Sequence, residues 1–277
     1  MFATPEDATN ALVEALASDN YPLFLSVAGP QMAGFWGTAD SQKDVGGRDS
    51  LAEAARSKGF RTDSAAENRK VLYAGTTAYA FPAPLVKTVG GWRFDDEAGS
   101  RELTARRIQR NETAVIETCR RFRDAEYEFF SAPDRQVHTF APRIRSTPGQ
   151  HDGLFWSEPG REDESPVGPQ FAAAAFTEHQ PSGGTRPFFG YYFKVLLAQG
   201  PDAPGGALDY RTKGRLRRGF ALIAWPAEYG LDGTQTFLLN HLGDIYEKDL
   251  GANTARIAQA MTTFNPDRSW ATYAGLD

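Results

Sequence analysis

The spacing of apolar positions predicts helices at the start of this chain, followed by short strands. Thr4 is a good N-cap and Pro5 suits the first position of a helix, and Ala8, Leu12 and Leu16 then repeat at helical spacing. Two further helices are predicted over residues 21–27 and 49–58, and strands over 71–74, 79–81, 85–89 and 92–95. The first hundred residues therefore favour a module of helices followed by an antiparallel meander.

The pattern becomes helical again from residue 100 to about 130, where apolar residues recur at intervals of three and four without an intervening proline. This predicts one long helix, or two helices separated by a kink near Asn111. Four aromatic-rich runs predict antiparallel strands over residues 191–198, 220–225, 234–240 and 244–247. A short helix over 169–176 and a final helix over 253–261, capped by Asn253, complete the pattern.

Together these elements predict an α+β protein with two modules. The first is the N-terminal α+β module over residues 1–98, and the second spans 99–277, where the long helix packs on a four-stranded antiparallel sheet. The stretch 131–169 is rich in proline, glycine, serine and charge, which predicts a long loop. Loops of that length are usually functional or flexible.

Composition narrows the class of protein. The 277 residues are 41% hydrophobic and 23% charged, which is typical of a globular protein with a buried core. A formal charge of -5 and a pI near 5.5 argue against nucleic acid as a partner, because phosphates require a basic surface. No apolar run approaches the roughly 20 residues of a membrane span. The single cysteine, Cys119, excludes an internal disulfide and a multi-cysteine metal site.

The compartment is left open by these observations. Residues 1–5 lack the charged start and apolar core of a signal peptide. Either the protein is cytoplasmic, or a leader peptide is absent from this sequence. Low cysteine use is compatible with both alternatives.

Several motifs together resemble one bacterial family. They are HDGLFW (151–156), GYYFKVLLAQGP (190–201), GFALIAWPAEYG (219–230), YEKDLG (246–251) and FNPDRSW (264–270). They look like the bacterial domain-of-unknown-function family 2950, and the resemblance spans nearly the whole chain. It implies a periplasmic or secreted protein that is normally made with a leader peptide and has no assigned activity.

Each module also resembles a known fold in the order of its elements. The helices and meander that close on GGWRFD resemble nuclear-transport-factor-two-like domains. The long helix, loop and four strands of the second module resemble the heads of type IV pilins and pseudopilins, although charged ELTARRIQRN replaces the apolar segment that filament assembly needs.

The bacterial family named above often carries an acidic, glycine-bearing stretch that would suit calcium. Only Asp134 remains of it here, so no metal site is predicted.

Candidate catalytic residues are few. His151 and Asp152 are adjacent in a predicted loop and could serve as a base or a ligand, together with the carboxylates Asp244 and Glu247 of the second sheet. The simpler interpretation makes Asp152 part of a turn and the two carboxylates solvated. The histidines at 138, 179 and 241 show no metal-ligand spacing, and no phosphate loop or nucleophile elbow is present.

Candidate binding residues are aromatic side chains with a polar group. They are Trp156, Tyr191, Tyr192, Trp225 and Tyr229, which are also readily explained as core packing. The many arginines of the long helix could face an anionic partner, but acidic residues at helical spacing, among them Glu112, Glu117 and Glu126, favour a solvated, salt-bridged face.

The sequence thus favours a non-enzymatic, extracytoplasmic binding or structural protein, with loop 131–169 as its interaction element. Its expected partner is an unidentified protein or envelope component, and no cofactor is expected. The alternative is a hydrolase of envelope polysaccharide or peptide that uses His151 and Asp152 with carboxylates of the second sheet. A third possibility is a small-ligand pocket in the N-terminal module, lined by residues such as Leu12 and Phe81.

Overall fold

A computed structural model describes residues 1–36, 53, 56–57, 59–76, 79–132, 137–157, 165–176 and 186–275. The chain divides into two compact units, Met1–Arg106 and Arg107–Asp277. Both this division and the boundary predicted after residue 98 fall inside one helix, α4 (Asp96–Ser131). Most of the helix predicted over residues 49–58 lies outside the described residues.

The first unit begins with the predicted helices. Thr4 caps α1 (Pro5–Ala17) in a capping box, where its side chain accepts from the Asp7 N–H and the Asp7 carboxylate accepts from the Thr4 N–H, both at 3.1 Å. Helix α2 (Tyr21–Ala28) ends at Gly29 and is followed by the 3-10 helix η1 (Pro30–Trp36). These starts and stops confirm the predictions made from local residues.

The meander of the first unit is a four-stranded antiparallel sheet in sequential order. Its strands are β1 (Phe60–Ala66), β2 (Arg69–Ala74), β3 (Leu85–Thr88) and β4 (Gly91–Phe94). Strand β1 was not predicted, because its polar sequence lacks apolar alternation. The strand predicted over 79–81 reduces to a single bridge between Tyr73 and Ala80, next to two prolines that cannot donate backbone hydrogen bonds.

The four residues proposed to line a ligand pocket in the first unit are packed in its hydrophobic core. Leu12, Leu16, Phe24 and Phe81 are at most 4% exposed and belong to one hydrophobic cluster. The rings of Phe24 and Phe81 meet edge to face at 6.5 Å. The residues proposed to line a cavity therefore fill the core.

Helix α4 is continuous, without a break at Asn111, and contributes to both units. Its second half packs on a five-stranded antiparallel sheet in the order β13-β12-β11-β10-β5. The strands are β5 (Tyr191–Leu196), β10 (Ala221–Pro226), β11 (Gln235–Asn240), β12 (Ile245–Asp249) and β13 (Ala271–Thr272). The four predicted strands are present, but the expectation of a four-stranded sheet is wrong. A fifth strand, β13, lies at the edge and was not predicted because it is short and lacks an apolar run.

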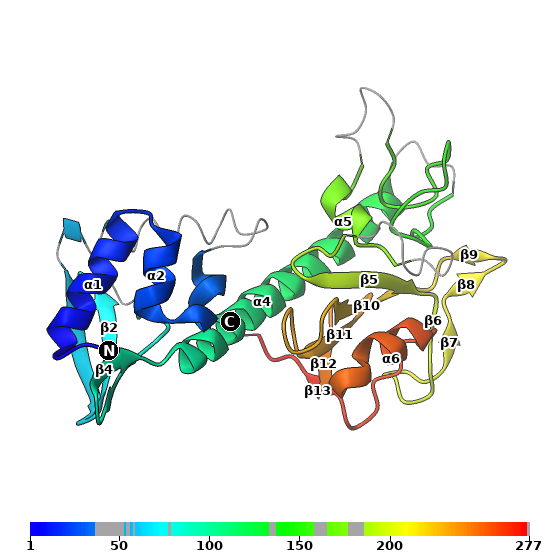
Figure 1. The fold of residues 1–277 in the computed structure, drawn as a ribbon. Helices are drawn as coiled ribbons and strands as arrows, with labels where there is room; N and C mark the ends of the chain where they lie inside the picture. Colours follow the sequence, from blue (N-terminus) through cyan, green and yellow to red (C-terminus); the bar gives the residue numbers. More distant parts are fainter. Residues whose placement is uncertain are drawn as a thin grey trace. The chain divides into compact units, whose positions relative to one another are not determined.

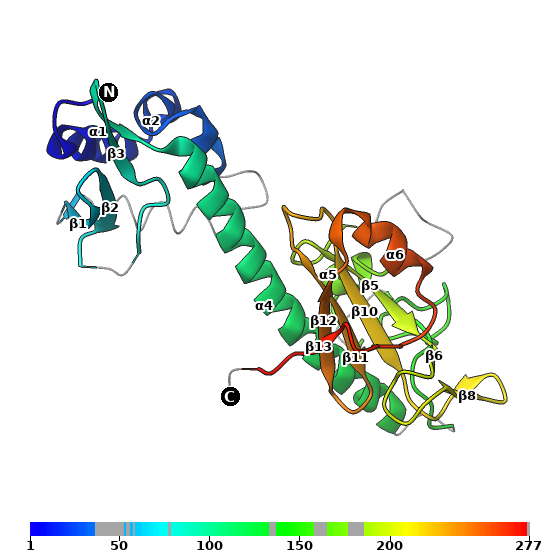
Figure 2. The same cartoon turned by 90° about the horizontal axis from the view of Figure 1, so that it is seen from below.

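The two faces of this sheet are covered by different helices (Figures 1 and 2). Tyr191 and Phe193 of β5 belong to the core that includes α4. Lys194, whose side chain points to the opposite face, donates to the carbonyls of Ala258 and Gln259 at the end of α6 (Thr254–Ala260). The predicted cap of α6 is wrong, since Asn253 makes no capping hydrogen bond through its side chain.

Helix α4 is tied to the second sheet at both ends of the contact. Glu112 accepts from the backbone N–H groups of Thr234 and Gln235 at 2.8 and 2.9 Å. At the far end, the Tyr127 hydroxyl donates to the His241 carbonyl at 3.1 Å. Between them Cys119 is buried, and burial raises the pKa of its thiol to about 12, so this side chain serves as a small apolar residue of the core.

Short elements complete the second unit. They are α5 (Pro169–Ala173), the 3-10 helix η3 (Gly251–Asn253), the pair β6 (Ala198–Gln199) and β7 (Leu208–Asp209), and the hairpin β8 (Arg211–Thr212) and β9 (Arg215–Leu216). Among the described residues, no helix combines the length and apolar character that a membrane span requires.

Candidate functional site

One candidate site is a cavity of about 540 Å³ in the second unit, called here the aromatic groove. One wall is a single face of α4, because its residues recur at intervals of three and four. They are Ala114, Glu117, Thr118, Arg121 and Phe122. The facing wall comes from residues 166–171, which lead into α5, and from Phe188 and Phe189 just before β5.

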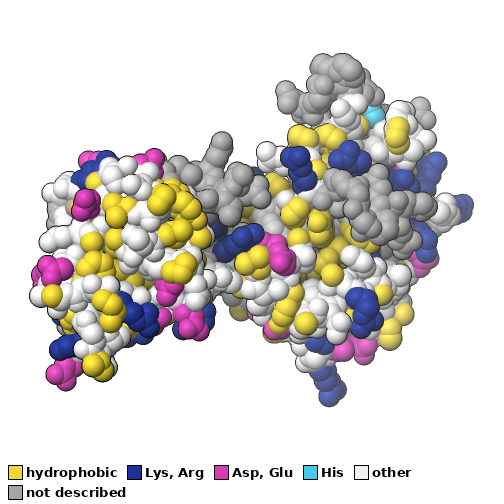
Figure 3. Space-filling view, viewed as in Figure 1, with side chains coloured by type: hydrophobic (Ala, Val, Ile, Leu, Met, Phe, Trp, Pro, Cys, Tyr) yellow, Lys and Arg dark blue, Asp and Glu magenta, His cyan; other side chains and the backbone are white. Residues whose placement is uncertain are grey.

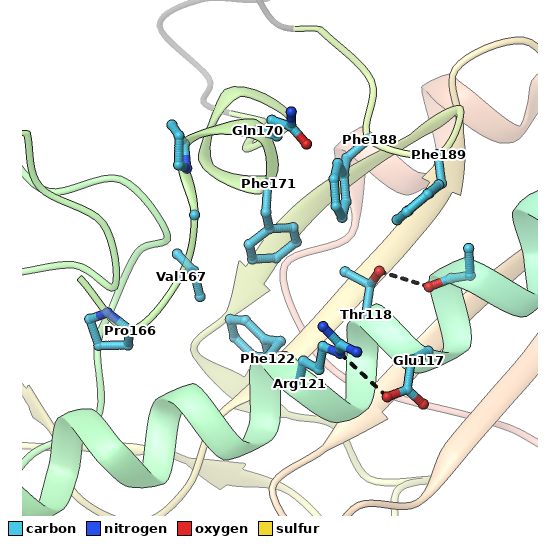
Figure 4. A pocket seen from close by; sticks show the side chains of 13 residues that line it. Glu117, Thr118, Arg121, Phe122, Pro166, Val167, Gln170, Phe171, Phe188 and Phe189 are labelled. Carbon is cyan, nitrogen blue, oxygen red and sulfur yellow. Dashed lines mark hydrogen bonds and ion pairs between the residues drawn. The ribbon is translucent and has the colours of Figure 1, made fainter. Parts of the chain in front are cut away.

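Four aromatic rings converge in the groove (Figure 4). Phe122 on α4 meets Phe171 edge to face at 6.3 Å, and Phe171 meets Phe188 at 6.0 Å. Phe189 lies 4.4 Å from Phe188, measured between ring centroids. Phe122 and Phe171 also belong to the main core, so the base of the groove is continuous with the hydrophobic core of the unit.

A charged pair lies beside these rings. The Arg121 Nε approaches Glu117 Oε1 at 3.4 Å, and the two side chains are 80% and 53% exposed. Such a pair contributes little to stability, so both groups remain able to turn toward a ligand. The Thr118 hydroxyl already makes a hydrogen bond within the helix, since it donates to the Ala114 carbonyl at 2.7 Å.

Phe189 has an unusual backbone conformation. Its φ is 49°, in the left-handed region that bulky side chains rarely occupy, and its side chain is 38% exposed. The following residue, Gly190, also has a positive φ and lies against Asn111 and Asp232, where a Cβ atom would come within 2.8 and 2.9 Å. The two residues before β5 thus both have left-handed backbone, and the second of them has no room for a side chain.

A second cavity of about 400 Å³ contains two of the predicted catalytic residues, His151 and Asp152. Asp152 accepts from the Thr147 N–H at 2.7 Å and from the Thr147 hydroxyl at 2.9 Å, and Arg143 lies 3.5 Å away. Burial raises the pKa of Asp152, but these hydrogen bonds and Arg143 outweigh it and bring the pKa below its ordinary value. This carboxylate organises a turn and is a poor proton carrier near neutral pH.

The other proposed catalytic residues lie elsewhere. Asp244 accepts from the Asn240 amide at 2.9 Å in the turn between β11 and β12. Glu247 lies within β12, where burial and the neighbouring charge of Glu112 raise its pKa. Neither is among the described residues that line the cavity of His151.

The predicted binding aromatics are mostly engaged in packing. Trp156 stacks on His151 at 4.4 Å. Tyr191 is fully buried and donates to the Gln235 carbonyl at 2.9 Å, and burial raises its pKa. Trp225 is fully buried beside the half-buried Tyr192, at 6.2 Å between ring centroids.

Tyr229 is more accessible, at 37% exposed, and its hydroxyl donates to Asp249 Oδ2 at 3.1 Å. None of the five predicted binding residues is among the described residues that line the aromatic groove.

The histidines do not assemble a metal site in the described residues, where no group of three or more His, Cys, Asp or Glu side chains could hold an ion. His138 contacts the Phe130 carbonyl through Nδ1 at 2.7 Å. Burial lowers the pKa of His241, and Asp244 partly opposes this effect. His179 and Asp134 lie outside the described residues.

Sequence reasoning missed the aromatic groove. Its helical wall was interpreted as a solvated arginine face, and most of that interpretation is correct, since Arg101, Arg106 and Arg121 pair with glutamates four positions earlier. The available signal was the pair Phe188-Phe189 directly before a glycine, which places two large apolar residues at a tight turn.

Comparisons with known proteins give one match. A family model described as "Protein of unknown function (DUF2950)" matches residues 1–273. No curated protein and no solved structure matches the chain. The resemblances to pilin heads and to nuclear-transport-factor-two-like domains therefore find no support in these comparisons.

Proposed function

This chain belongs to the DUF2950 family, and on that premise we propose that it is an extracytoplasmic binding protein whose ligand is held in the aromatic groove. The ligand is an envelope component that presents a flat apolar group. The groove's volume of about 540 Å³ lies within the range of small-molecule sites, and its lining is mainly apolar with a few polar groups.

The observation that carries this proposal is Phe189. A phenylalanine in the left-handed region costs about 1–2 kcal/mol relative to a glycine there. Its ring is still 38% exposed, so burial recovers only part of that cost. Strained backbone of this kind clusters at ligand-binding sites, where stability is sacrificed for a preorganised contact.

The lining specifies the chemistry of the ligand. The rings of Phe171, Phe188 and Phe189 favour an aromatic or alicyclic group that can pack against their faces and edges. Arg121 and Glu117 would then orient a polar substituent at the rim, since their side chains are largely exposed. A ligand with an apolar body and one hydrogen-bonding group fits both features.

The hydrolase alternative has weaker support. Asp152 is held in a turn by Thr147 and Arg143, and His151 is stacked on Trp156. A general acid for hydrolysis needs a carboxyl group with a raised pKa, whereas the pKa of Asp152 is lowered.

A Phe189→Asn variant tests the groove. Asparagine tolerates left-handed backbone, so we expect the melting temperature to be unchanged or higher. Titration with N-phenyl-1-naphthylamine, a fluorescent apolar probe, should show an affinity at least about tenfold weaker than that of the wild type, because one aromatic wall is lost.

The matched control is Val89→Asn, which removes an exposed apolar side chain from the first unit and should leave probe binding unchanged. Probe binding that is equal in wild type and Phe189→Asn would contradict the proposed site. A large loss of stability in Phe189→Asn would show instead that the ring serves the fold.

The extracytoplasmic location is also part of the proposal. It rests on what the motif resemblance implies, namely a protein that is normally made with a leader peptide. Expression of the complete native gene followed by osmotic shock should release the mature protein with the periplasmic fraction or place it in the medium. Recovery with the cytoplasmic fraction alone would refute this part.

A further inference from the structure

A short segment of the second unit carries a concentrated positive charge that the overall charge of -5 conceals. Between residues 209 and 218 the chain has five basic residues and one acidic residue. The basic residues are Arg211, Lys213, Arg215, Arg217 and Arg218. They are exposed, and they lie on or directly after the β8–β9 hairpin. The hairpin lies at the right of Figure 1, and dark blue side chains of Lys and Arg gather at that edge in Figure 3.

Asp209 is the one acidic residue within this segment. Only Arg211 forms an ion pair in the described part of the chain, with Asp209 at 3.0 Å. Lys213 and Gly214 form the turn with φ values of 50° and 74°, which matches the right-handed twist of a tight hairpin. Lys213 lies at the tip, whereas Arg217 and Arg218 lie at the base, where their backbone N–H groups donate to the Tyr210 carbonyl at 3.1 Å. Arg215 also lines the cavity that contains Asp152.

The base of the hairpin is firmly attached to the core. Tyr210 is fully buried, and its hydroxyl donates to Gln199 Oε1 at 2.9 Å. Leu216 is 2% exposed, and its carbonyl accepts from the Phe140 N–H at 2.9 Å. The hairpin is thus held from both of its ends, and the charges are presented by a rigid support.

An apolar turn lies beside the base of this hairpin. His241, in the β11–β12 turn, meets the Tyr210 ring at 5.8 Å, and a Cβ atom on Gly219 would come within 2.8 Å of its Nδ1 atom. The next residue, Leu242, is 67% exposed, and Tyr127, which donates to the His241 carbonyl, is 42% exposed. An aliphatic and an aromatic side chain are therefore exposed beside the base of the hairpin that carries the cations.

We propose that this basic surface, formed by the five cations together with Leu242 and Tyr127, binds the anionic phospholipid headgroups of a membrane surface. Clusters of four to eight basic residues are typical of anionic lipid recognition, and aromatic and aliphatic side chains add contact with the headgroup–acyl boundary. An anionic polymer would use the cations but would have no use for exposed Leu242. The surface is separate from the aromatic groove, so either proposal can fail without the other.

The experiment is flotation of the purified full chain with lipid vesicles. We expect binding to vesicles that contain about one-third phosphatidylglycerol and none to phosphatidylcholine alone, and binding should weaken as salt rises from about 0.1 to about 0.5 M. Each cation near such a surface contributes about fivefold in partitioning, so the triple variant Lys213→Gln, Arg215→Gln, Arg217→Gln should bind about 100-fold more weakly. Leu242→Ser should weaken binding about tenfold.

The matched control is the triple variant Arg61→Gln, Lys87→Gln, Arg256→Gln, which removes the same charge from exposed positions elsewhere and should bind within a few-fold of the wild type. Equal losses in the two triple variants would overturn the proposal, as would an absence of binding to the anionic vesicles. Binding of a short DNA duplex should also be measured. If the duplex bound as tightly as the vesicles, and if Leu242→Ser changed neither DNA binding nor vesicle binding, the surface would be one for anionic polymers.

Discussion

Replacement of Glu126 by glutamine should raise the stability of the protein at neutral pH and remove a large part of its pH dependence. Glu126 is fully buried on α4, and within the described residues only one of its carboxylate oxygens is paired, with the Ala141 N–H at 2.8 Å. Burial raises the pKa of this carboxyl group well above its ordinary value, and the hydrogen bond from Ala141 only partly opposes the shift.

The sign of the effect follows from proton linkage. When the pKa of a carboxyl group is higher in the folded state than in the unfolded state, its contribution to stability is fully present only below the unfolded pKa, which is about 4.3. Above that value the stability contribution falls by about 1.4 kcal/mol per pH unit, until the pH passes the folded pKa. Glutamine keeps an acceptor for the Ala141 N–H and carries no titratable proton, so it avoids this loss.

Urea denaturation of wild type and Glu126→Gln between about pH 4.5 and pH 8 measures the difference. We expect the two unfolding free energies to be similar at the acidic end and to diverge in favour of glutamine as the pH rises. Glu128→Gln is the matched control, because Glu128 is exposed two positions further along the same helix, and it should follow the wild type. A parallel pH dependence in wild type and Glu126→Gln would contradict the assignment.

A Glu112→Ala variant should lose about 3 kcal/mol of unfolding free energy. The Glu112 carboxylate accepts from the Thr234 N–H, the Thr234 hydroxyl and the Gln235 N–H, at 2.8 to 3.1 Å. Alanine would leave two half-buried backbone donors at the start of β11 without their charged acceptor, and it would release one of the contacts that hold α4 against the sheet.

Thermal and urea unfolding of this variant can be compared with those of Glu117→Ala. That control removes the same side chain from a position of α4 that is 53% exposed, where a change of about 0.5 kcal/mol or less is expected. If both variants lost the same small amount, the hydrogen bonds of Glu112 to the β10–β11 loop would not be stabilising the contact.

Elements whose signals are local were predicted well. The capping box at Thr4 and Asp7 starts α1 as expected, and the aromatic runs form β5, β10, β11 and β12 close to their predicted ranges. Strands β1 and β13 were missed because polar sequences can pair at a sheet edge through their backbones alone. The absence of a capping bond at Asn253 shows that a suitable residue type does not ensure a cap.

Candidate sites were predicted less well, because their side chains come from distant parts of the chain. His151 and Asp152 do share a cavity, as neighbours in one turn can, whereas Asp244 and Glu247 lie apart from it. Glu126 was assigned to a solvated face from its spacing on α4, but it is fully buried and bonded to Ala141 of the following segment.

The sequence by itself determined the family, the α+β class, and the helices and strands that have clear periodicity or caps, because those signals act over a few neighbouring residues. The tertiary structure decided which polar groups lose contact with water and which aromatic rings remain accessible. Position 190 has to be glycine because Asn111 and Asp232 leave no room for a side chain there, next to Phe189 with its left-handed backbone and partly exposed ring. Such outcomes depend on the packing of segments that are remote in sequence, which no local pattern encodes.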